Sequence, residues 1–403
     1  MAESGQEQKN VFKQIFEDGW GDFKRRYPRY EAVDEVVQKM LGCGNPENGH
    51  AVYICPDCLE EYVVGFSCKS TFCLSCAKVY GQEWVETVKG MLHPGVKYRH
   101  LILTVPEGLR TLIYQHPGEL LEGMLQAARG AMDAAVGQAK RQAVELGYIV
   151  VLQTAGRAAN YNPHLHVLMT DGGLTEEGEW QTLGYVPYDL LHREWQAHVL
   201  RMVEERLPED AKAKAVVAEM KAKYPKGFVA HLKGDIVPRV SELAWYIVKY
   251  VVSPPMGLSR IIKYDRERGE VTYWYKDHLS RGKKTTVTVD RETFIGRMVQ
   301  HILPKGFQRI RPKVWTASDV QVEEGAGAIS GSVAKGSPVG DGGGGQAGEA
   351  VDVSGADETD IGARPAEVPA VWSRDVVVES VASEVQGDLR YGGTIETRGG
   401  GGI

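Results

Sequence analysis

The sequence predicts an α+β protein with a helical, cysteine-rich N-terminal region, an antiparallel sheet flanked by helices, and a disordered tail. Three observations lead to this prediction. Apolar residues repeat at helical spacing before residue 42, whereas runs typical of strands recur between residues 98 and 289. All six cysteines lie between Cys43 and Cys76. Beyond about residue 318, glycine, alanine, serine, valine and acidic residues dominate, and such a segment buries too little apolar surface to fold.

Composition indicates a globular protein outside the membrane. The chain has 403 residues, of which 43% are hydrophobic and 25% charged. It has no apolar run near the ~20 residues of a membrane span, and its polar, acidic start is unlike a secretory signal. We therefore expect a cytoplasmic, nucleoid-associated protein with no membrane partner. The net charge of −6 does not exclude a nucleic-acid partner, because residues 321–403 hold 14 acidic and 5 basic residues and the rest is slightly basic.

The cysteines predict a structural metal site. Four of them form two Cys-x-x-Cys pairs: Cys55, Cys58, Cys73 and Cys76. Fourteen residues separate the pairs, so the spacer can fold back as a hairpin and bring four thiolates onto one closed, tetrahedral Zn²⁺. Clustered cysteines in a cytosolic protein indicate metal rather than disulfides. Three further candidates form either a second site or buried thiols and a surface histidine: Cys43, His50 and Cys68.

The central region alternates strands and helices. Residues 98–105 read as a strand closed by a proline, and residues 118–146 as a helix ended by Gly147. Residues 148–153 then form a strand that pairs with the next one as a hairpin. Residues 174–224 are charged and helical, and a short strand that contains His231 follows.

Two histidines flank one apolar residue in the strand 161–170. Strand side chains alternate, so His164 and His166 share a face while Leu165 points into the core. Two parallel imidazoles make half of a divalent-metal site. Gln153 in the paired strand is a candidate third ligand through its neutral oxygen. The simpler interpretation is a histidine pair on a solvent-facing strand.

A second candidate motif lies on the helix 241–252, which two prolines end. Tyr246 and Tyr250 are one turn apart, so both hydroxyls lie on one face, with Lys249 close by. The simpler interpretation is that both tyrosines only pack. After this helix we expect a hairpin, a further strand and a last helix from residue 291, capped by Asp290, before a basic segment.

Together the two motifs suggest phosphodiester chemistry. A divalent cation would polarise a phosphodiester, and a tyrosine hydroxyl would attack it to leave a covalent phosphotyrosine and a free sugar hydroxyl. Because the bond energy is retained, a later hydroxyl can reverse the step and join strands without ATP.

With these motifs the chain resembles a known family, the HUH-type, two-tyrosine transposases of rolling-circle insertion sequences that carry an N-terminal zinc-binding domain. The resemblance covers roughly residues 10–311. It rests on the cysteine knuckles with Phe66-Ser67-Cys68-Lys69, on Leu103-Thr104-Val105-Pro106, Leu152-Gln153-Thr154, His164-Leu165-His166, Asp171-Gly172-Gly173, Tyr246-Ile247-Val248-Lys249-Tyr250, Pro254-Pro255 and Leu303-Pro304-Lys305-Gly306-Phe307.

The resemblance implies roles for these residues. His164 and His166, with Gln153 as the further candidate, would bind Mg²⁺ or Mn²⁺, and the two tyrosines would nick single-stranded DNA at the element's ends, leaving a 5′-phosphotyrosine. The DNA contacts would be made by Lys249, Arg309 and Arg311. The implied domains are a helical and zinc-ribbon DNA-binding domain (1–95), an HUH catalytic domain (96–316, with 174–226 as a helical insertion) and a disordered tail (317–403).

The sequence leaves two other functions open. A rolling-circle replication initiator or relaxase uses the same chemistry at an origin, and the DNA that flanks the gene separates it from a transposase. The other alternative is a zinc-ribbon DNA-binding protein without catalysis, in which the histidines and tyrosines are structural. The sequence leaves the DNA target and the oligomeric state open.

Overall fold

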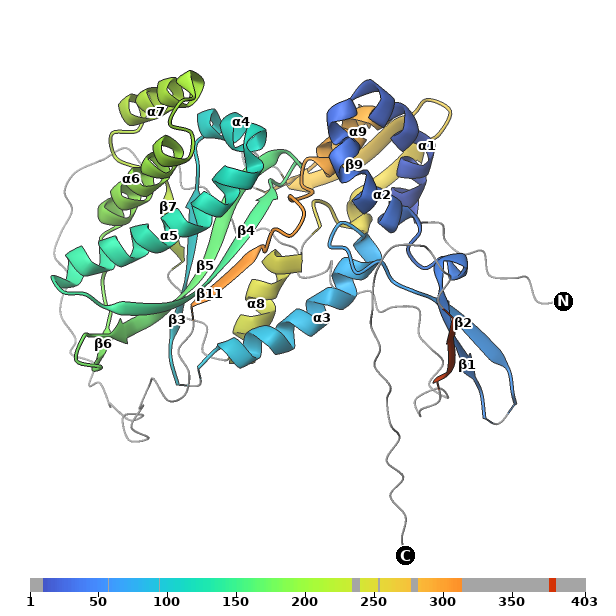
Figure 1. Ribbon diagram of the computed structural model, residues 1–403, viewed down its shortest axis with the longest axis horizontal. Coiled ribbons are helices and arrows are strands. Elements are labelled where there is room, and N and C mark those ends of the chain that lie inside the picture. Colours follow the sequence, from blue (N-terminus) through green and yellow to red (C-terminus); the bar gives the residue numbers. More distant parts are fainter. Residues whose placement is uncertain are drawn as a thin grey trace, which may run out of the picture. The chain divides into compact units, whose positions relative to one another are not determined.

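The computed structural model describes residues 10–56, 58–93, 95–233, 240–252, 254–276 and 282–313, together with the strand Val377–Val381 (Figure 1). Residues 1–41 and 69–363 form one compact unit, and residues 42–68 and 364–403 form another. The described part contains helices and antiparallel sheets, which confirms the predicted α+β class. Among the described residues, no helix combines the length and apolarity needed to span a membrane.

The first unit contains an antiparallel sheet whose strands follow the order β11-β4-β5-β3-β7, and β6 also pairs with β5. The strands have these bounds: β3 Tyr98–Thr104, β4 Glu145–Ala155, β5 Tyr161–Leu174, β6 Trp180–Thr182, β7 Ala230–Lys233 and β11 Ile310–Lys313. The long strand β5 lies between β4 and β3. It is apolar along most of its length because both faces of the sheet are covered.

Helices cover both faces of this sheet, as Figure 1 shows. One face carries α4 (Glu107–Gln115), α5 (Pro117–Lys140), α6 (Tyr188–Arg206) and α7 (Ala211–Lys223), and the other carries α3 (Leu74–Met91) and α8 (Val240–Val252). The alternation of β5 divides its side chains between two cores. Leu165 and Val167 face the α4–α7 side, and Leu168 faces the α3 and α8 side. Trp195 of α6 is fully buried in the first of these cores.

A second group of elements in this unit joins the N-terminal helices to a small sheet. These elements are α1 (Val11–Arg26), η1 (Pro28–Val33), α2 (Asp34–Leu41), η3 (Leu258–Arg260), β8 (Ile261–Asp265), β9 (Glu270–Lys276), β10 (Lys284–Asp290) and α9 (Arg291–Val299). Asn10 caps α1, and the apolar stripe of this helix presents Phe12 and Phe16 to the interior. The Phe12 ring meets Phe294 of α9 edge to face at 6.3 Å. Asp290 caps α9 through the amide of Thr293, as predicted.

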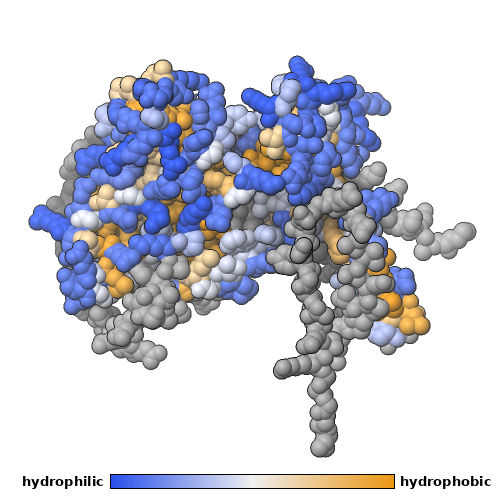
Figure 2. Space-filling view, viewed as in Figure 1, coloured by the Kyte–Doolittle hydropathy of each residue, from blue (hydrophilic) through white to orange (hydrophobic). Residues whose placement is uncertain are grey.

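The second unit contains a three-stranded sheet of order β12-β1-β2. Its elements are η2 (Pro46–Asn48), β1 (His50–Ile54), β2 (Glu61–Gly65) and β12 (Val377–Val381). Exposed apolar side chains gather on the β1–β2 hairpin (Figure 2), among them Tyr62, Val63 and Val64. Apart from β12, the segment 317–403, predicted to be disordered, lies outside the described residues.

One helix prediction was wrong. The expected helix 118–146 is α5, which begins with Pro117 and already ends at Lys140, and α4 precedes it. Arg141 adopts a left-handed conformation at φ 58°, which ends the helix. Gly147 is not a helix terminator but a residue of β4, because the strand begins at Glu145 and pairs with β5. The helix therefore ends at its C-cap Arg141, before the glycine.

Candidate active site

The two histidines of β5 lie on the sheet face that α3 and α8 cover. His164 pairs with Gln153 of β4 and Thr104 of β3, and His166 lies one pleat further along. Leu165 between them is fully buried in the opposite core. Only 5% of His164 and 1% of His166 is exposed. This burial rules out a histidine pair on a solvent-facing strand.

His164 is held as a neutral imidazole. Its Nδ1 lies 2.7 Å from the carbonyl oxygen of Asn162, so the proton on Nδ1 is donated to this acceptor. Burial lowers the pKa of His164, and the positive charge of Arg110 lowers it further. The ring therefore keeps its Nε2 lone pair, the form in which imidazole binds a metal ion.

His166 is part of a chain of four hydrogen-bonded groups. Its Nε2 lies 3.2 Å from Oε1 of Gln153, and its Nδ1 lies 3.0 Å from Nε2 of His100. The Nδ1 of His100 in turn lies 2.7 Å from the hydroxyl of Tyr246. An amide oxygen only accepts, so with both rings neutral every hydrogen bond runs from the tyrosine toward the glutamine. The chain links the helix α8 to three neighbouring strands.

The sequence analysis did not single out His100. This residue lies in β3, opposite Leu168 of β5, and is 4% exposed. The available signal was a histidine directly before the apolar run Leu101–Leu103 of the strand, because a buried histidine must have a hydrogen-bond partner. His231 of β7 is exposed. It pairs with Ile102 of β3, which pairs with His166 on its other side.

The two tyrosines of α8 take different positions at the site. The helix is fixed by apolar side chains in the core: Leu243, Ala244, Ile247 and Val248. Tyr250 is 7% exposed and its ring stacks on His166, with centroids 3.6 Å apart and planes 15° apart. Burial, and to a lesser degree the neighbouring Tyr246, raises the pKa of Tyr250. Tyr246 presents its hydroxyl to His100 instead.

The predicted DNA contacts differ in their surroundings. The side chain of Lys249 lies outside the described residues. Arg311 forms an ion pair with Glu122 of α5 at 2.8 Å. Arg309 is partly exposed, yet protein atoms surround it closely, and this burial lowers its pKa to about 10.

Four cysteine sulfurs form a cluster suited to zinc. The Sγ atoms of Cys43, Cys68, Cys73 and Cys76 all lie within 4.8 Å of one another. Around one zinc ion four thiolates stand about 3.8 Å apart, given Zn–S bonds of about 2.3 Å, so the set fits a closed structural site. All six cysteines are free of disulfides.

The structure therefore regroups the predicted ligands. It brings one predicted pair, Cys73 and Cys76 at the start of α3, together with the two leftover cysteines. The other predicted pair is not in the cluster: Cys55 is buried and Cys58 is exposed. His50 is bonded to the carbonyl of Pro46 at 2.9 Å.

Two family models match the chain. Residues 15–105, which hold all six cysteines, match a transposase zinc-binding domain, and residues 147–321 match a putative transposase. The second match contains both β5 histidines and both α8 tyrosines. Together the two matches cover more than half of the chain.

Curated relatives agree with these models. The transposase for insertion sequence element IS801 of Pseudomonas savastanoi pv. phaseolicola is 28% identical over 289 residues, which is 69% of this chain and 68% of the relative. A putative transposase, y4qJ, of Sinorhizobium fredii (strain NBRC 101917 / NGR234) is 23% identical over 328 residues, 77% and 80% of the two chains. No solved structure matches. With a match to a transposase zinc-binding domain followed by a match to a putative transposase, the chain is similar to transposases, one of which is the transposase of an insertion sequence element.

Proposed function

We propose that this chain is a rolling-circle transposase that nicks and rejoins single-stranded DNA at the ends of an insertion sequence. The observation that carries the proposal is the chain of hydrogen bonds from Tyr246 through His100 to His166. A tyrosine-bearing helix packed on a histidine-bearing antiparallel sheet is what an HUH nuclease domain at 96–316 would require. Similarity to a protein named as an insertion-sequence transposase supports DNA as the partner.

The residues present fit a divalent cation. His164 would bind through Nε2, His166 through Nε2 and Gln153 through Oε1. The last two atoms lie 3.2 Å apart, and Gln153 pairs directly with His164 across the two strands. Neutral imidazoles bind divalent cations in general, and Mg²⁺ or Mn²⁺, which prefer oxygen ligands, would take the Gln153 oxygen together with solvent or phosphate oxygens. A cation bound there supplies Lewis-acid polarisation of a phosphodiester.

The tyrosine supplies the nucleophile. Its oxygen loses a proton and forms a bond to phosphorus, the bond from phosphorus to the 3′ oxygen breaks, and that oxygen takes up one proton and leaves as a hydroxyl, so the protons balance. The product is a 5′-phosphotyrosine with a free 3′ hydroxyl on the other fragment. Attack by a 3′ hydroxyl on this linkage reverses the step, because the phosphodiester energy is retained. Strand joining therefore needs no nucleotide cofactor.

His100 positions the Tyr246 hydroxyl for this reaction. Without a cation, the hydrogen bonds run from the tyrosine to the oxygen of Gln153, which only accepts. If Nε2 of His166 and Oε1 of Gln153 held a cation, the proton of His166 would lie on Nδ1 and the hydrogen bonds would run in the opposite direction. In one direction the tyrosine donates to Nδ1 of His100. In the other, Nδ1–H of His100 donates to the tyrosine oxygen and stabilises the phenolate, which is the stronger nucleophile.

The second tyrosine extends the reaction to two strands. Tyr250 lies one helical turn from Tyr246, with ring centroids 5.7 Å apart. One tyrosine can hold a strand end while the other attacks a second phosphodiester. Burial raises the pKa of Tyr250, which makes its phenolate harder to form, whereas the hydroxyl of Tyr246 is hydrogen-bonded to His100. We therefore assign the first cleavage to Tyr246.

The four-sulfur cluster has a structural role in this proposal. Four protein ligands leave zinc no open position for substrate, so this site does not take part in the cleavage. A small domain of this kind has little core of its own, and metal binding and folding are then a single event.

The experiment that tests the proposal is a covalent adduct assay. The full-length protein is mixed with Mg²⁺ and a labelled single strand that carries the end of the element flanking its gene, and denaturing gels separate any protein–DNA adduct. We expect an adduct whose attached residue maps to Tyr246 or Tyr250. A strand that carries a replication origin serves as the comparison for an initiator.

The decisive variant is the double substitution Tyr246→Phe with Tyr250→Phe. It keeps both rings and their stacking, so loss of the adduct reports the hydroxyls alone. Tyr185→Phe, at a side chain 77% exposed outside the site, is the matched control. An undiminished adduct in the double variant would refute the assignment. DNA binding without any adduct in the unaltered protein would favour a zinc-ribbon protein without catalysis.

A further inference from the structure

A large cavity opens next to the proposed active site. It has a volume of about 1140 Å³, slightly above the ~300–1,000 Å³ usual for small-ligand sites. Its walls come from α2, from residues 69–72 with α3, from the end of β4, and from the segment 301–312 that leads into β11. All of these segments belong to the first unit.

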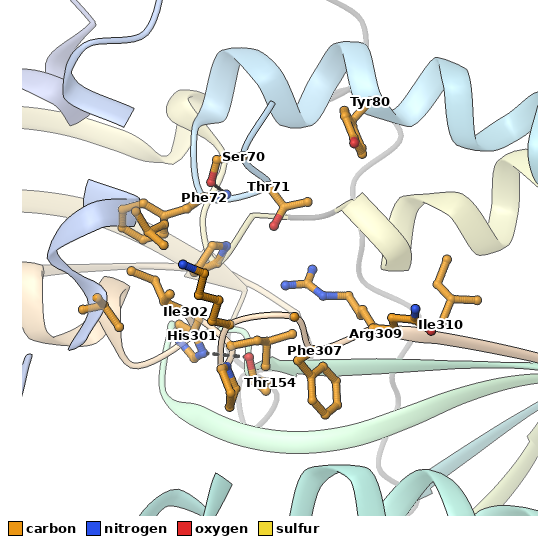
Figure 3. A pocket seen from close by; sticks show the side chains of 18 of the residues that line it. Ser70, Thr71, Phe72, Tyr80, Thr154, His301, Ile302, Phe307, Arg309 and Ile310 are labelled. Carbon is orange, nitrogen blue, oxygen red and sulfur yellow. Dashed lines mark hydrogen bonds between the residues drawn. The ribbon is translucent and has the colours of Figure 1, made fainter. Parts of the chain in front are cut away.

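The walls are predominantly positive. Among the described lining residues, four are basic and one is acidic: Lys39, Lys69, Lys305, Arg309 and Glu35. The acidic residue is already shared by two of the lysines, at 2.7 Å from Lys39 and 3.5 Å from Lys305. Figure 3 shows the guanidinium of Arg309 extending into the space between α3 and the segment that contains Phe307. A cation in such a confined place attracts an anion strongly.

Aromatic side chains also line the cavity. Tyr80 and Trp84 of α3 line the cavity from one side and Phe307 from the other, and all three are partly exposed. Figure 3 shows Tyr80 directed from α3 toward the cavity. Basic side chains with partly exposed aromatic faces are the combination that binds single strands, because phosphates pair with the cations and unstacked bases stack on the rings.

The cavity adjoins the reacting groups. Gln153 lines it, and the same side chain is hydrogen-bonded to His166. Thr154, the next residue, also lines it and is bonded to the buried His301 at 3.1 Å. A strand whose phosphate lies at His164 and His166 therefore has this cavity directly beside it.

We propose that the cavity is a subsite for unstacked nucleotides of the single strand adjacent to the cleaved phosphodiester. Arg309 binds a backbone phosphate, and Tyr80, with Trp84 or Phe307, stacks on a base. A paired duplex is excluded, because its bases are stacked on their neighbours and present no free ring face to the walls. This inference rests on the proposed function in its choice of DNA as the ligand.

The test measures binding of single-stranded DNA by the full-length Tyr246→Phe, Tyr250→Phe protein, which binds without cleaving. The probe is a fluorescein-labelled oligothymidylate longer than the roughly 16 nucleotides that one such groove covers. Tyr80→Ala is expected to weaken binding about fivefold or more, the loss of one stacked base. Arg309→Ala is expected to weaken binding and to reduce the slope of log K against log salt by about 0.7, the loss of one phosphate contact.

Two matched controls come from the surface far from the cavity. Arg201→Ala removes an exposed arginine of α6, and Tyr185→Ala removes an exposed tyrosine. Both are expected to bind as the parent does. A second measurement uses probes with a single abasic nucleotide at successive positions. One position should weaken binding to the parent, and Tyr80→Ala should abolish that positional effect.

The outcomes separate this inference from the proposed function. Parent-like affinity in both Tyr80→Ala and Arg309→Ala, with no positional effect of the abasic nucleotide, overturns the subsite even if the unaltered protein forms its adduct. If the unaltered protein forms no adduct but the two cavity variants still lose affinity, the subsite stands and the cleavage mechanism falls. An equal loss of affinity in the controls Arg201→Ala and Tyr185→Ala would also overturn the subsite.

Discussion

The hydroxyl of Tyr246 lies 2.7 Å from Nδ1 of His100, a residue 146 positions earlier in the chain. This contact ties α8 to β3, the strand that pairs with the histidine-bearing strand β5. Because His100 also contacts His166, a single residue connects the proposed nucleophile to a proposed metal ligand.

Removing the His100 acceptor should slow cleavage by Tyr246 specifically. His100→Ala removes the hydrogen bond to His166 and also the one to the Tyr246 hydroxyl. Loss of the latter, worth about 0.5–1.5 kcal/mol, should slow adduct formation roughly two- to twelvefold. His100→Asn should recover part of the rate, because its amide oxygen lies near the place of Nδ1. Rates are measured in a Tyr250→Phe background, where Tyr246 is the proposed nucleophile. An equal slowing in the Tyr246→Phe background would contradict a positioning role.

Changing Gln153 should alter the concentration of metal ion that adduct formation requires. Gln153→Ala removes a proposed ligand, so the Mg²⁺ concentration for half-maximal adduct formation should rise at least about tenfold. Gln153→Glu adds a negative charge and should lower it. Mn²⁺ binding by the protein alone, followed by electron paramagnetic resonance, gives a readout without activity. Identical titrations for both variants and the parent would remove Gln153 from the site.

The cysteine cluster predicts which thiols hold zinc. Cys43→Ser or Cys73→Ser should release the ion, because either change removes one of four ligands. Cys58→Ser, at an exposed thiol outside the cluster, should leave the zinc of the cluster in place. Native mass spectrometry of the intact protein counts the bound ions. Retained zinc in Cys43→Ser with loss in Cys58→Ser would instead support the grouping predicted from Cys-x-x-Cys spacing.

The buried His301 should make the fold sensitive to acid. Burial lowers the pKa of His301 to about 4, below its ordinary value of 6.5. Between these two values the unfolded chain binds a proton that the folded protein does not, so stability is complete above 6.5 and falls as the pH drops toward 4. The free energy of unfolding should fall by about 2 kcal/mol from about pH 7 to pH 5 through this residue.

His301→Gln isolates this contribution, because glutamine does not titrate. The variant is expected to be less stable at neutral pH, since His301 is bonded to Thr154 and to the carbonyl of Ala159. Its unfolding free energy, from urea titration, should nevertheless change less between the two pH values than that of the parent. A parallel pH dependence in both proteins would show that His301 is not the titrating group.

Local patterns predicted most of the elements. The alternation of β5 was enough to place His164 and His166 on one face and Leu165 on the other, because side-chain direction in a strand depends only on its period. The hairpin partner of β5 was also foreseen, and with it the pairing of Gln153 opposite His164. The end of α5 was missed, because the pairing of Glu145 with Leu174 extends β4 past the glycine that appeared to stop the helix.

The sequence by itself determined the candidates for the chemistry that we propose: a histidine pair on a strand, a tyrosine pair on a helix, and clustered cysteines. Tertiary structure alone decided their partners. It brought His100 to Tyr246 and regrouped Cys43 and Cys68 with Cys73 and Cys76. Spacing along the chain orients side chains within one element, but contacts between elements depend on sheet order and packing, which no local pattern encodes.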